Sequence, residues 1–233
     1  LNRSVSDLRV GRIDALITAP INKANMPKHL FPYPGHTEML PDRLGADQSL
    51  MLLVNDGLRV GLVSNYLPIS AVAAAVTKKA ILEKLAIMHE SLQRDFGCPS
   101  PRIAVFGLNP HAGDNGLLGQ EEKTTIIPVL EEARRNGINA EGPYPADGFF
   151  GTGAQERFDG ILAMYHDQGL APFKALSFGK GVNFTAGLPA VRSSPDHGTA
   201  FDIAGQGIAD PSSFLQAIEV AMTAVKRRSE TPE

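Results

Sequence analysis

Three histidines stand in short polar segments that contain glycine: His36, His111 and His166. His111 and His166 each follow an apolar run, and the glycines beside them let a ligand approach the backbone closely. Two imidazoles at strand ends could hold a divalent metal, but such a site needs at least three protein ligands and the spacing shows only two. His29 and His89 are interpreted as structural or surface residues.

Two cations stand in segments that we interpret as loops, Lys174 in Ala-Pro-Phe-Lys and Arg192 in Val-Arg-Ser-Ser-Pro. A solvated surface cation is the plain alternative for each of them. Together with Asn183 and the nearby glycines, however, they would supply positive charge and amide donors suited to a phosphate or carboxylate. These residues therefore favour an anionic ligand.

A nucleotide would need an unusual site, because the sequence has neither a Gly-x-Gly-x-x-Gly segment after a strand nor a Walker-type loop. The segment 197–205 contains two glycines, a threonine and an aspartate that could wrap a nucleoside. A tight ordered connection is the alternative interpretation. The candidate nucleotide-binding residues are His197, Gly198, Thr199 and Asp202.

Short apolar runs alternate with longer helical patterns, which is typical of an α/β protein with a parallel sheet and crossover helices. We expect strands at 13–19, 50–54, 59–64, 103–108, 161–165 and 182–186, and helices at 70–96, 121–136 and 211–228. In open α/β sheets ligands bind beyond the carboxyl ends of the strands. The polar segments around His111 and His166 begin at those ends.

Composition excludes several classes of partner. The 233 residues carry 22 Lys and Arg against 25 Asp and Glu, a net charge of -3, so there is no basic surplus for nucleic acid or an anionic membrane. No apolar run approaches the roughly 18 residues needed to cross a bilayer. The single cysteine, Cys98, cannot form an internal disulfide, which fits a reducing cytoplasm. Because the chain begins without Met, we expect the native chain to start earlier.

Four motifs occur together and in order: Gly-His-Thr-Glu at 35–38, Leu-Asn-Pro-His-Ala-Gly at 108–113, Pro-Ala-Asp at 145–147 and Tyr-His-Asp-Gln-Gly at 165–169. With them the chain resembles the 4-hydroxythreonine-4-phosphate dehydrogenase family of vitamin B6 biosynthesis. The segment 197–205 also looks like the adenosine-binding loop of isocitrate and isopropylmalate dehydrogenases. The resemblance covers nearly the whole chain.

The resemblance implies an isocitrate/isopropylmalate dehydrogenase-like α/β fold with two domains, the first incomplete here. Residues 34–200 would form the substrate- and metal-binding domain, and 1–33 with 201–233 the remainder of the cofactor-binding domain. It also implies NAD(P)- and metal-dependent oxidation, with decarboxylation, of a phosphorylated hydroxy amino acid such as 4-phosphooxy-L-threonine. The implied cofactors are NAD or NADP and zinc, magnesium or cobalt.

The resemblance assigns roles to individual residues as well. His111 and His166 would bind the metal, His166 reaching across the interface of a homodimer with shared active sites. The small phosphorylated substrate would contact His36, Thr37, Asp147, Lys174, Asn183 and Arg192.

The chain departs from the family pattern in two respects. Tyr66 stands where relatives typically carry a third metal-ligating histidine, and a neutral phenol is a poor ligand for zinc or magnesium. About a third of the family chain, before the first expected strand, has no counterpart. The alternative function is therefore a truncated or degenerate member that binds a phosphorylated ligand without turnover. A metal-dependent hydrolase using His111 and His166 is a third possibility, but it leaves the segment 197–205 unexplained.

Overall fold

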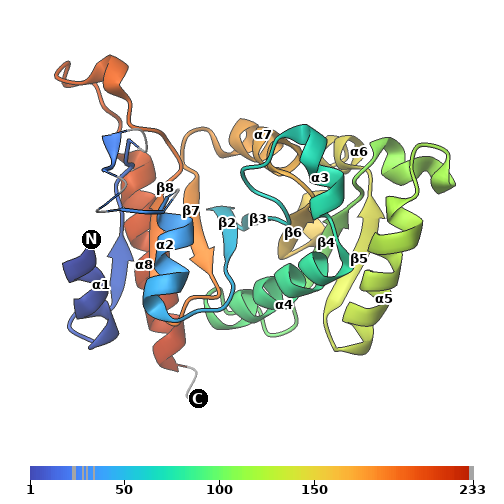
Figure 1. Ribbon diagram of the computed structural model, residues 1–233, viewed down its shortest axis with the longest axis horizontal. Coiled ribbons are helices and arrows are strands. Elements are labelled where there is room, and N and C mark those ends of the chain that lie inside the picture. Colours follow the sequence, from blue (N-terminus) through green and yellow to red (C-terminus); the bar gives the residue numbers. More distant parts are fainter. Residues whose placement is uncertain (23–24, 28, 30, 34, 231–233) are drawn as a thin grey trace.

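A computed structural model describes residues 1–22, 25–27, 29, 31–33 and 35–230 (Figure 1). The strands are β1 Ala15–Ile17, β2 Leu50–Asn55, β3 Leu58–Leu62, β4 Arg102–Phe106, β5 Asn139–Tyr144, β6 Gly160–Ala163, β7 Val182–Ala186 and β8 Val191–Pro195. The helices are α1 Asn2–Arg9, α2 His36–Leu44, α3 Ile69–Ala75, α4 Lys78–Arg94, α5 Ile127–Arg135, α6 Ala146–Gly151, α7 His166–Ser177 and α8 Ser212–Glu230. Within these residues, no helix combines the length and apolarity that a membrane crossing requires.

The strands form one sheet in the order β1-β8-β7-β2-β3-β6-β4-β5. Pairing is parallel between β1 and β8, and among β3, β6, β4 and β5, but β2 runs antiparallel to both β3 and β7, and β7 antiparallel to β8. The α/β class is confirmed, whereas the sheet is mixed and only part of it is parallel as expected. Asp56 and Gly57 join β2 to β3 with φ values of 38° and 92°, and two positive φ angles are what a tight hairpin turn requires.

Apolar residues fill β2 because helices cover both faces of the sheet. Leu50, Leu52 and Val54 belong to a core shared with α4, α5 and α8, whereas Met51 and Leu53 belong to the opposite core with α6 and α7. Successive side chains of a strand point to opposite faces, so a strand covered on both sides is expected to be apolar at most positions. Figure 1 shows α4 and α7 on either side of the central strands.

Two expected helices are each divided in the structure. The pattern at 70–96 becomes α3 and α4, because Thr77 takes an extended conformation and its hydroxyl accepts a hydrogen bond from the Ala80 N–H at 3.2 Å, capping α4. The pattern at 121–136 begins with a π-helical segment, Glu122–Ile126, and continues as α5. The third expected helix is α8.

Both cations expected in loops lie in regular structure. Lys174 lies on α7. Our sequence analysis did not predict this helix, because glycine and proline, here Gly169 and Pro172, are unfavourable inside helices. Gly169 is needed there, since a Cβ at this position would lie 2.9 Å from the Leu62 side chain on the sheet. Arg192 is on β8, whose five residues are all buried although three of them are polar.

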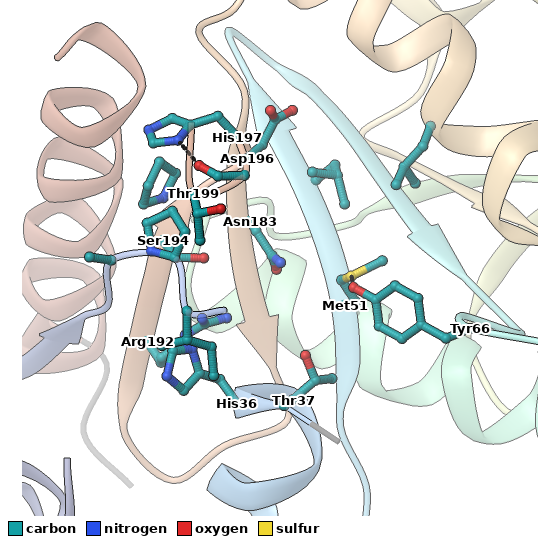
Figure 2. Close-up of a pocket in the computed structure, with 18 of the residues that line it drawn as sticks. His36, Thr37, Met51, Tyr66, Asn183, Arg192, Ser194, Asp196, His197 and Thr199 are labelled. Atoms are coloured by element: carbon teal, nitrogen blue, oxygen red, sulfur yellow. Dashed lines mark hydrogen bonds between the residues drawn. The ribbon is translucent and has the colours of Figure 1, made fainter. Parts of the chain in front are cut away.

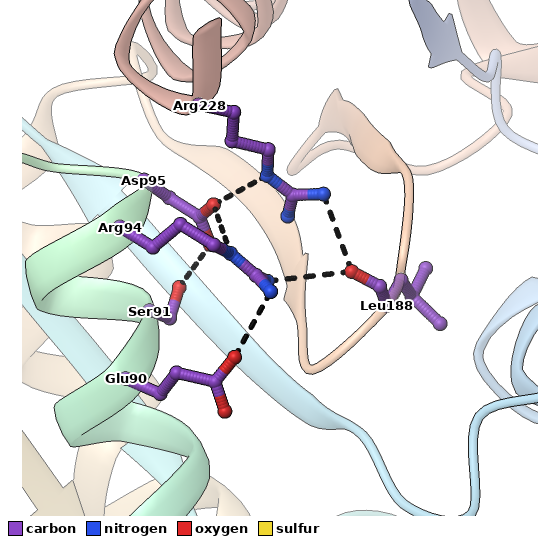
Figure 3. Close-up of polar contacts among 6 residues, drawn as sticks. All are labelled: Glu90, Ser91, Arg94, Asp95, Leu188 and Arg228. Atoms are coloured by element: carbon purple, nitrogen blue, oxygen red, sulfur yellow. Dashed lines mark hydrogen bonds and ion pairs between the residues drawn. The ribbon is translucent and has the colours of Figure 1, made fainter. Parts of the chain in front are cut away.

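A buried carboxylate joins the ends of α4 and α8 to the sheet (Figure 3). The Asp95 side chain is 0% exposed and accepts hydrogen bonds from the Ser91 hydroxyl at 2.6 Å, Arg94 Nε at 3.2 Å and Arg228 Nε at 2.7 Å. Both arginines also donate to the carbonyl of Leu188, between β7 and β8, at 3.3 Å each. The cluster therefore ties α8 and the turn that leads into β8 to the end of α4.

Replacing Asp95 by Ala is expected to lower the free energy of unfolding by about 3–5 kcal/mol, because two guanidinium groups lose their carboxylate. Urea denaturation followed by circular dichroism measures the loss. Asp47→Ala, at an exposed position, is the matched control. A loss below about 1 kcal/mol for Asp95→Ala would show that the cluster contributes no more than surface ion pairs do.

Candidate functional site

A cavity of about 620 Å³ lies over the sheet between α2 and α7 (Figure 2). Its lining includes Met51 of β2, Asn183 of β7 and Arg192 of β8. His36 of α2 and Lys174 of α7 line it as well. The elements that build this cavity come from both ends and the middle of the chain.

Arg192 is a buried cation in this cavity. Its side chain donates to the hydroxyls of Thr185 at 3.0 Å and Thr18 at 2.7 Å, and the residue is only 3% exposed. Nε is buried without a hydrogen-bond partner in the part of the chain that the structure describes. Burial lowers the pKa of the guanidinium to about 10, so it remains protonated at neutral pH. A buried charge held by hydroxyl groups is suited to bind an anion.

The first turn of α2 adds further positive potential. His36 and Thr37, expected in a loop, are the first two residues of this nine-residue helix, and Gly35 precedes them as the N-cap. As a glycine, Gly35 has no side chain that could cap the helix. Since helix N-termini favour anions, the turn complements Arg192 in the same cavity.

The predicted nucleotide-binding segment lies partly in the cavity. His197, Gly198 and Thr199 line it, whereas Asp202 is exposed, lies outside the lining and accepts a hydrogen bond through its backbone carbonyl. Asp196 also lines the cavity, and its Oδ2 is buried without a hydrogen-bond partner among the described residues. Our sequence analysis missed Asp196, although its position directly before His197 could have drawn attention to it.

The two histidines expected to share a metal line different cavities of one chain. His166 lines the cavity with Arg192, whereas His111 and Asp147 line a second cavity of about 510 Å³. Among the described residues, no group of three or more His, Cys, Asp or Glu side chains could hold a metal ion. The described residues of a single chain therefore do not fit a closed metal site.

Tyr66 lies beside His166, with ring centroids 5.8 Å apart. Its hydroxyl lies 3.9 Å from the sulfur of Met51, within reach of a weak hydrogen bond. Burial raises the pKa of the phenol, and the carboxylate of Glu38 raises it further. Tyr66 therefore stays protonated at neutral pH and can serve as a neutral hydrogen-bonding group.

His111 belongs to a strained turn. Residues 111–115 all have positive φ, between 40° and 80°, and four of them are not glycine. The left-handed conformation costs an ordinary residue about 1–2 kcal/mol. Strain of this kind persists only where the surroundings hold it, and it is concentrated at functional sites.

Known structures first define the class of protein. Isocitrate dehydrogenase from Methylococcus capsulatus superposes with a TM-score of 0.56 at 14% identity, covering 98% of this chain and 72% of that chain. At that identity the likeness shows the fold alone, and it confirms the isocitrate dehydrogenase-like α/β architecture expected from the sequence.

Closer relatives then define the family. The family model described as "Pyridoxal phosphate biosynthetic protein PdxA" matches residues 1–221, and the chain belongs to this family. The 4-hydroxythreonine-4-phosphate dehydrogenase of Bacteroides thetaiotaomicron is 55% identical over 229 residues, covering 98% of this chain and 63% of the relative. The crystal structure of that enzyme from Klebsiella pneumoniae has a TM-score of 0.85 at 39% identity, covering 96% of this chain and 68% of that chain. The resemblance found in the sequence is confirmed, and the chain spans less than two thirds of the Bacteroides relative.

Arg192→Lys is expected to weaken binding of a phosphorylated ligand by roughly 2–3 kcal/mol, because an ammonium cannot make the forked contact of a guanidinium. Calorimetric titration of 4-phosphooxy-L-threonine into both proteins measures the difference. Arg135→Lys, which makes the same exchange at an exposed position of α5, is the control. Equal affinities for the native protein and Arg192→Lys would show that Arg192 has a structural role and does not bind the ligand.

Proposed function

We propose that the chain carries out NAD(P)-dependent oxidation, with decarboxylation, of a phosphorylated hydroxy amino acid such as 4-phosphooxy-L-threonine, in pyridoxal phosphate biosynthesis in the cytoplasm. The observation that carries this proposal is the buried guanidinium of Arg192 in one cavity with His197, Gly198 and Thr199. An anion site and a nucleotide-binding segment in contact with the same space are what hydride transfer between two bound molecules requires. The names of the relatives support the same reaction.

In this proposal, each cavity residue binds or orients one of the two molecules. Arg192 and Lys174 bind the anionic groups of the substrate, while Asn183 and the first turn of α2 orient it. The segment from His197 holds the nucleotide so that its nicotinamide meets the hydroxyl-bearing carbon. A bound NAD or NADP would accept a hydride from that carbon, and the proton of the hydroxyl would pass to solvent. The carboxylate of the resulting ketone would then leave as carbon dioxide, and a proton from solvent would take its place. Holding both molecules in place turns an encounter into a step within one complex.

We further propose that a second copy of the chain completes the site. His111 and Asp147 line a cavity separate from the one that His166 lines, so a homodimer is the arrangement that could bring them together. A divalent metal, zinc, magnesium or cobalt, would polarise the oxygen of the substrate if it bound between the two copies. We also propose that residues 34–200 form the substrate- and metal-binding domain, and that 1–33 and 201–233 form the remainder of the cofactor-binding domain. The boundary at residue 34 lies outside the described residues.

Incubating the chain with 4-phosphooxy-L-threonine and NAD or NADP is expected to reduce the nicotinamide and release one carbon dioxide per hydride. Absorbance of the reduced cofactor and trapped carbon dioxide are measured together. Lys174→Ala should bind the substrate more weakly, because it removes one of the two Lys and Arg side chains that line the cavity among the described residues. Calorimetric binding without reduction of either nucleotide would contradict the proposal and indicate a binding protein.

The shared site predicts complementation between two defective variants. His111→Ala and His166→Ala should each be inactive alone, whereas their refolded mixture should recover about a quarter of the native activity, because half of the dimers carry one intact site. Sedimentation velocity checks that both variants remain dimers. A native protein that sediments as a monomer while turning over substrate would contradict the shared site.

A further inference from the structure

The side-chain amide of Gln168 joins the two segments that carry His111 and His166. Its Nε2 donates to the carbonyl of Gly107 at 2.7 Å, and its Oε1 accepts from the N–H of Met164 at 2.7 Å. Gly107 follows β4 and leads into the turn of His111, while Met164 follows β6 and leads into α7. Both ends of the amide are therefore engaged with backbone groups.

A second buried group, the carboxylate of Glu122, also contacts the segment that carries His111. The carboxylate of Glu122 is 3% exposed and accepts hydrogen bonds from the N–H groups of Leu108 and Asn109, both at 2.8 Å, and from Asn109 Nδ2 at 3.0 Å. The turn packs directly on this carboxylate, because a Cβ on Gly113 would lie 2.5 Å from Oε2. Glu122 also opens the π-helical segment, a rare feature that often marks functional sites.

We propose that Gln168 and Glu122 are positioning residues that hold the strained turn of His111 in a fixed relation to the first turn of α7. This inference rests on the proposed function, for which both histidines must be placed precisely. The turn contains five consecutive residues with positive φ, so it needs outside restraint to keep this shape. Glu122 fixes the backbone that leads into the turn and packs against Gly113 within it. Gln168 connects the segment before the turn to the end of the strand that precedes His166.

Two variants separate the two ends of the Gln168 amide. Gln168→Leu removes both hydrogen bonds, whereas Gln168→Glu keeps an acceptor for Met164 N–H and loses the donor to Gly107. The probe is the set of histidine ring signals in the ¹⁵N NMR spectrum of the full chain, assigned with His111→Gln and His166→Gln. We expect Gln168→Leu to shift the signals of both His111 and His166, and Gln168→Glu to shift that of His111 alone.

Matched variants control for the change of residue type. Gln93→Leu breaks a similar hydrogen bond, from Gln93 Nε2 to the Pro99 carbonyl at the end of α4, and should move neither signal. Glu122→Gln should shift the His111 signal and leave that of His166 in place, whereas Glu132→Gln, on an exposed position of α5, should shift neither. Thermal unfolding shows which variants remain folded.

Activity supplies an independent measurement. Gln168→Leu is expected to lower kcat about 100-fold with little change in KM, as for a displaced reacting group. If the native chain turns over no substrate, the proposed function fails, yet the ring signals still test the positioning. An unshifted His111 signal in folded Gln168→Leu, or an equal shift of His197, would overturn the inference.

Discussion

Arg192 places a full positive charge inside the sheet, and much of the cavity follows from that charge. Removing an ion from water costs several kcal/mol even after the protein relaxes around it. The hydroxyls of Thr18 and Thr185 offset part of this cost with two hydrogen bonds, and Nε has no partner among the described residues. An anion bound in the cavity would offset more of this cost, and the N-terminus of α2 and Lys174 line the same space.

The position of the guanidinium depends on the alignment of three strands. Thr18 follows β1, Arg192 lies in β8 and Thr185 lies in β7, so the hydroxyls reach the guanidinium only in the observed register. Helix α8 supports this register from the other face, where the Ser193 hydroxyl donates to the carbonyl of Ala217 at 2.7 Å. The Asp95 cluster holds the far end of α8 and the turn before β8. Contacts remote from the cavity therefore fix where its charge lies.

The sequence was informative where burial imposes an apolar pattern. The run 182–186 is β7 as expected, and most of the residues predicted to bind substrate line one cavity.

The sequence was misleading where a tertiary contact decides the structure. Strand β8 is buried although it carries Arg192 and two serines, because hydrogen bonds engage both terminal nitrogens of Arg192 and the hydroxyl of Ser193. Helix α7 tolerates Gly169 because only glycine allows so close an approach to the sheet. The Asp56-Gly57 hairpin, in contrast, had a recognisable signal that our interpretation of a parallel sheet overlooked.

His111 and His166 line different cavities although the strands before them are neighbours in the sheet. His111 and His166 follow the neighbouring strands β4 and β6, which run parallel, so proximity at one sheet edge was a reasonable expectation. His166, however, begins α7 directly after its strand, while His111 lies in a left-handed turn that starts several residues beyond β4. The turn winds in the left-handed sense, opposite to that of an ordinary helix, and the two side chains line different cavities. If His111 and His166 were to bind the same metal ion, either the turn of His111 would have to rearrange or the two histidines would have to come from two copies of the chain. The hydrogen bonds that Glu122 accepts and the one that Gln168 donates hold the segment that leads into this turn, so they oppose such a rearrangement.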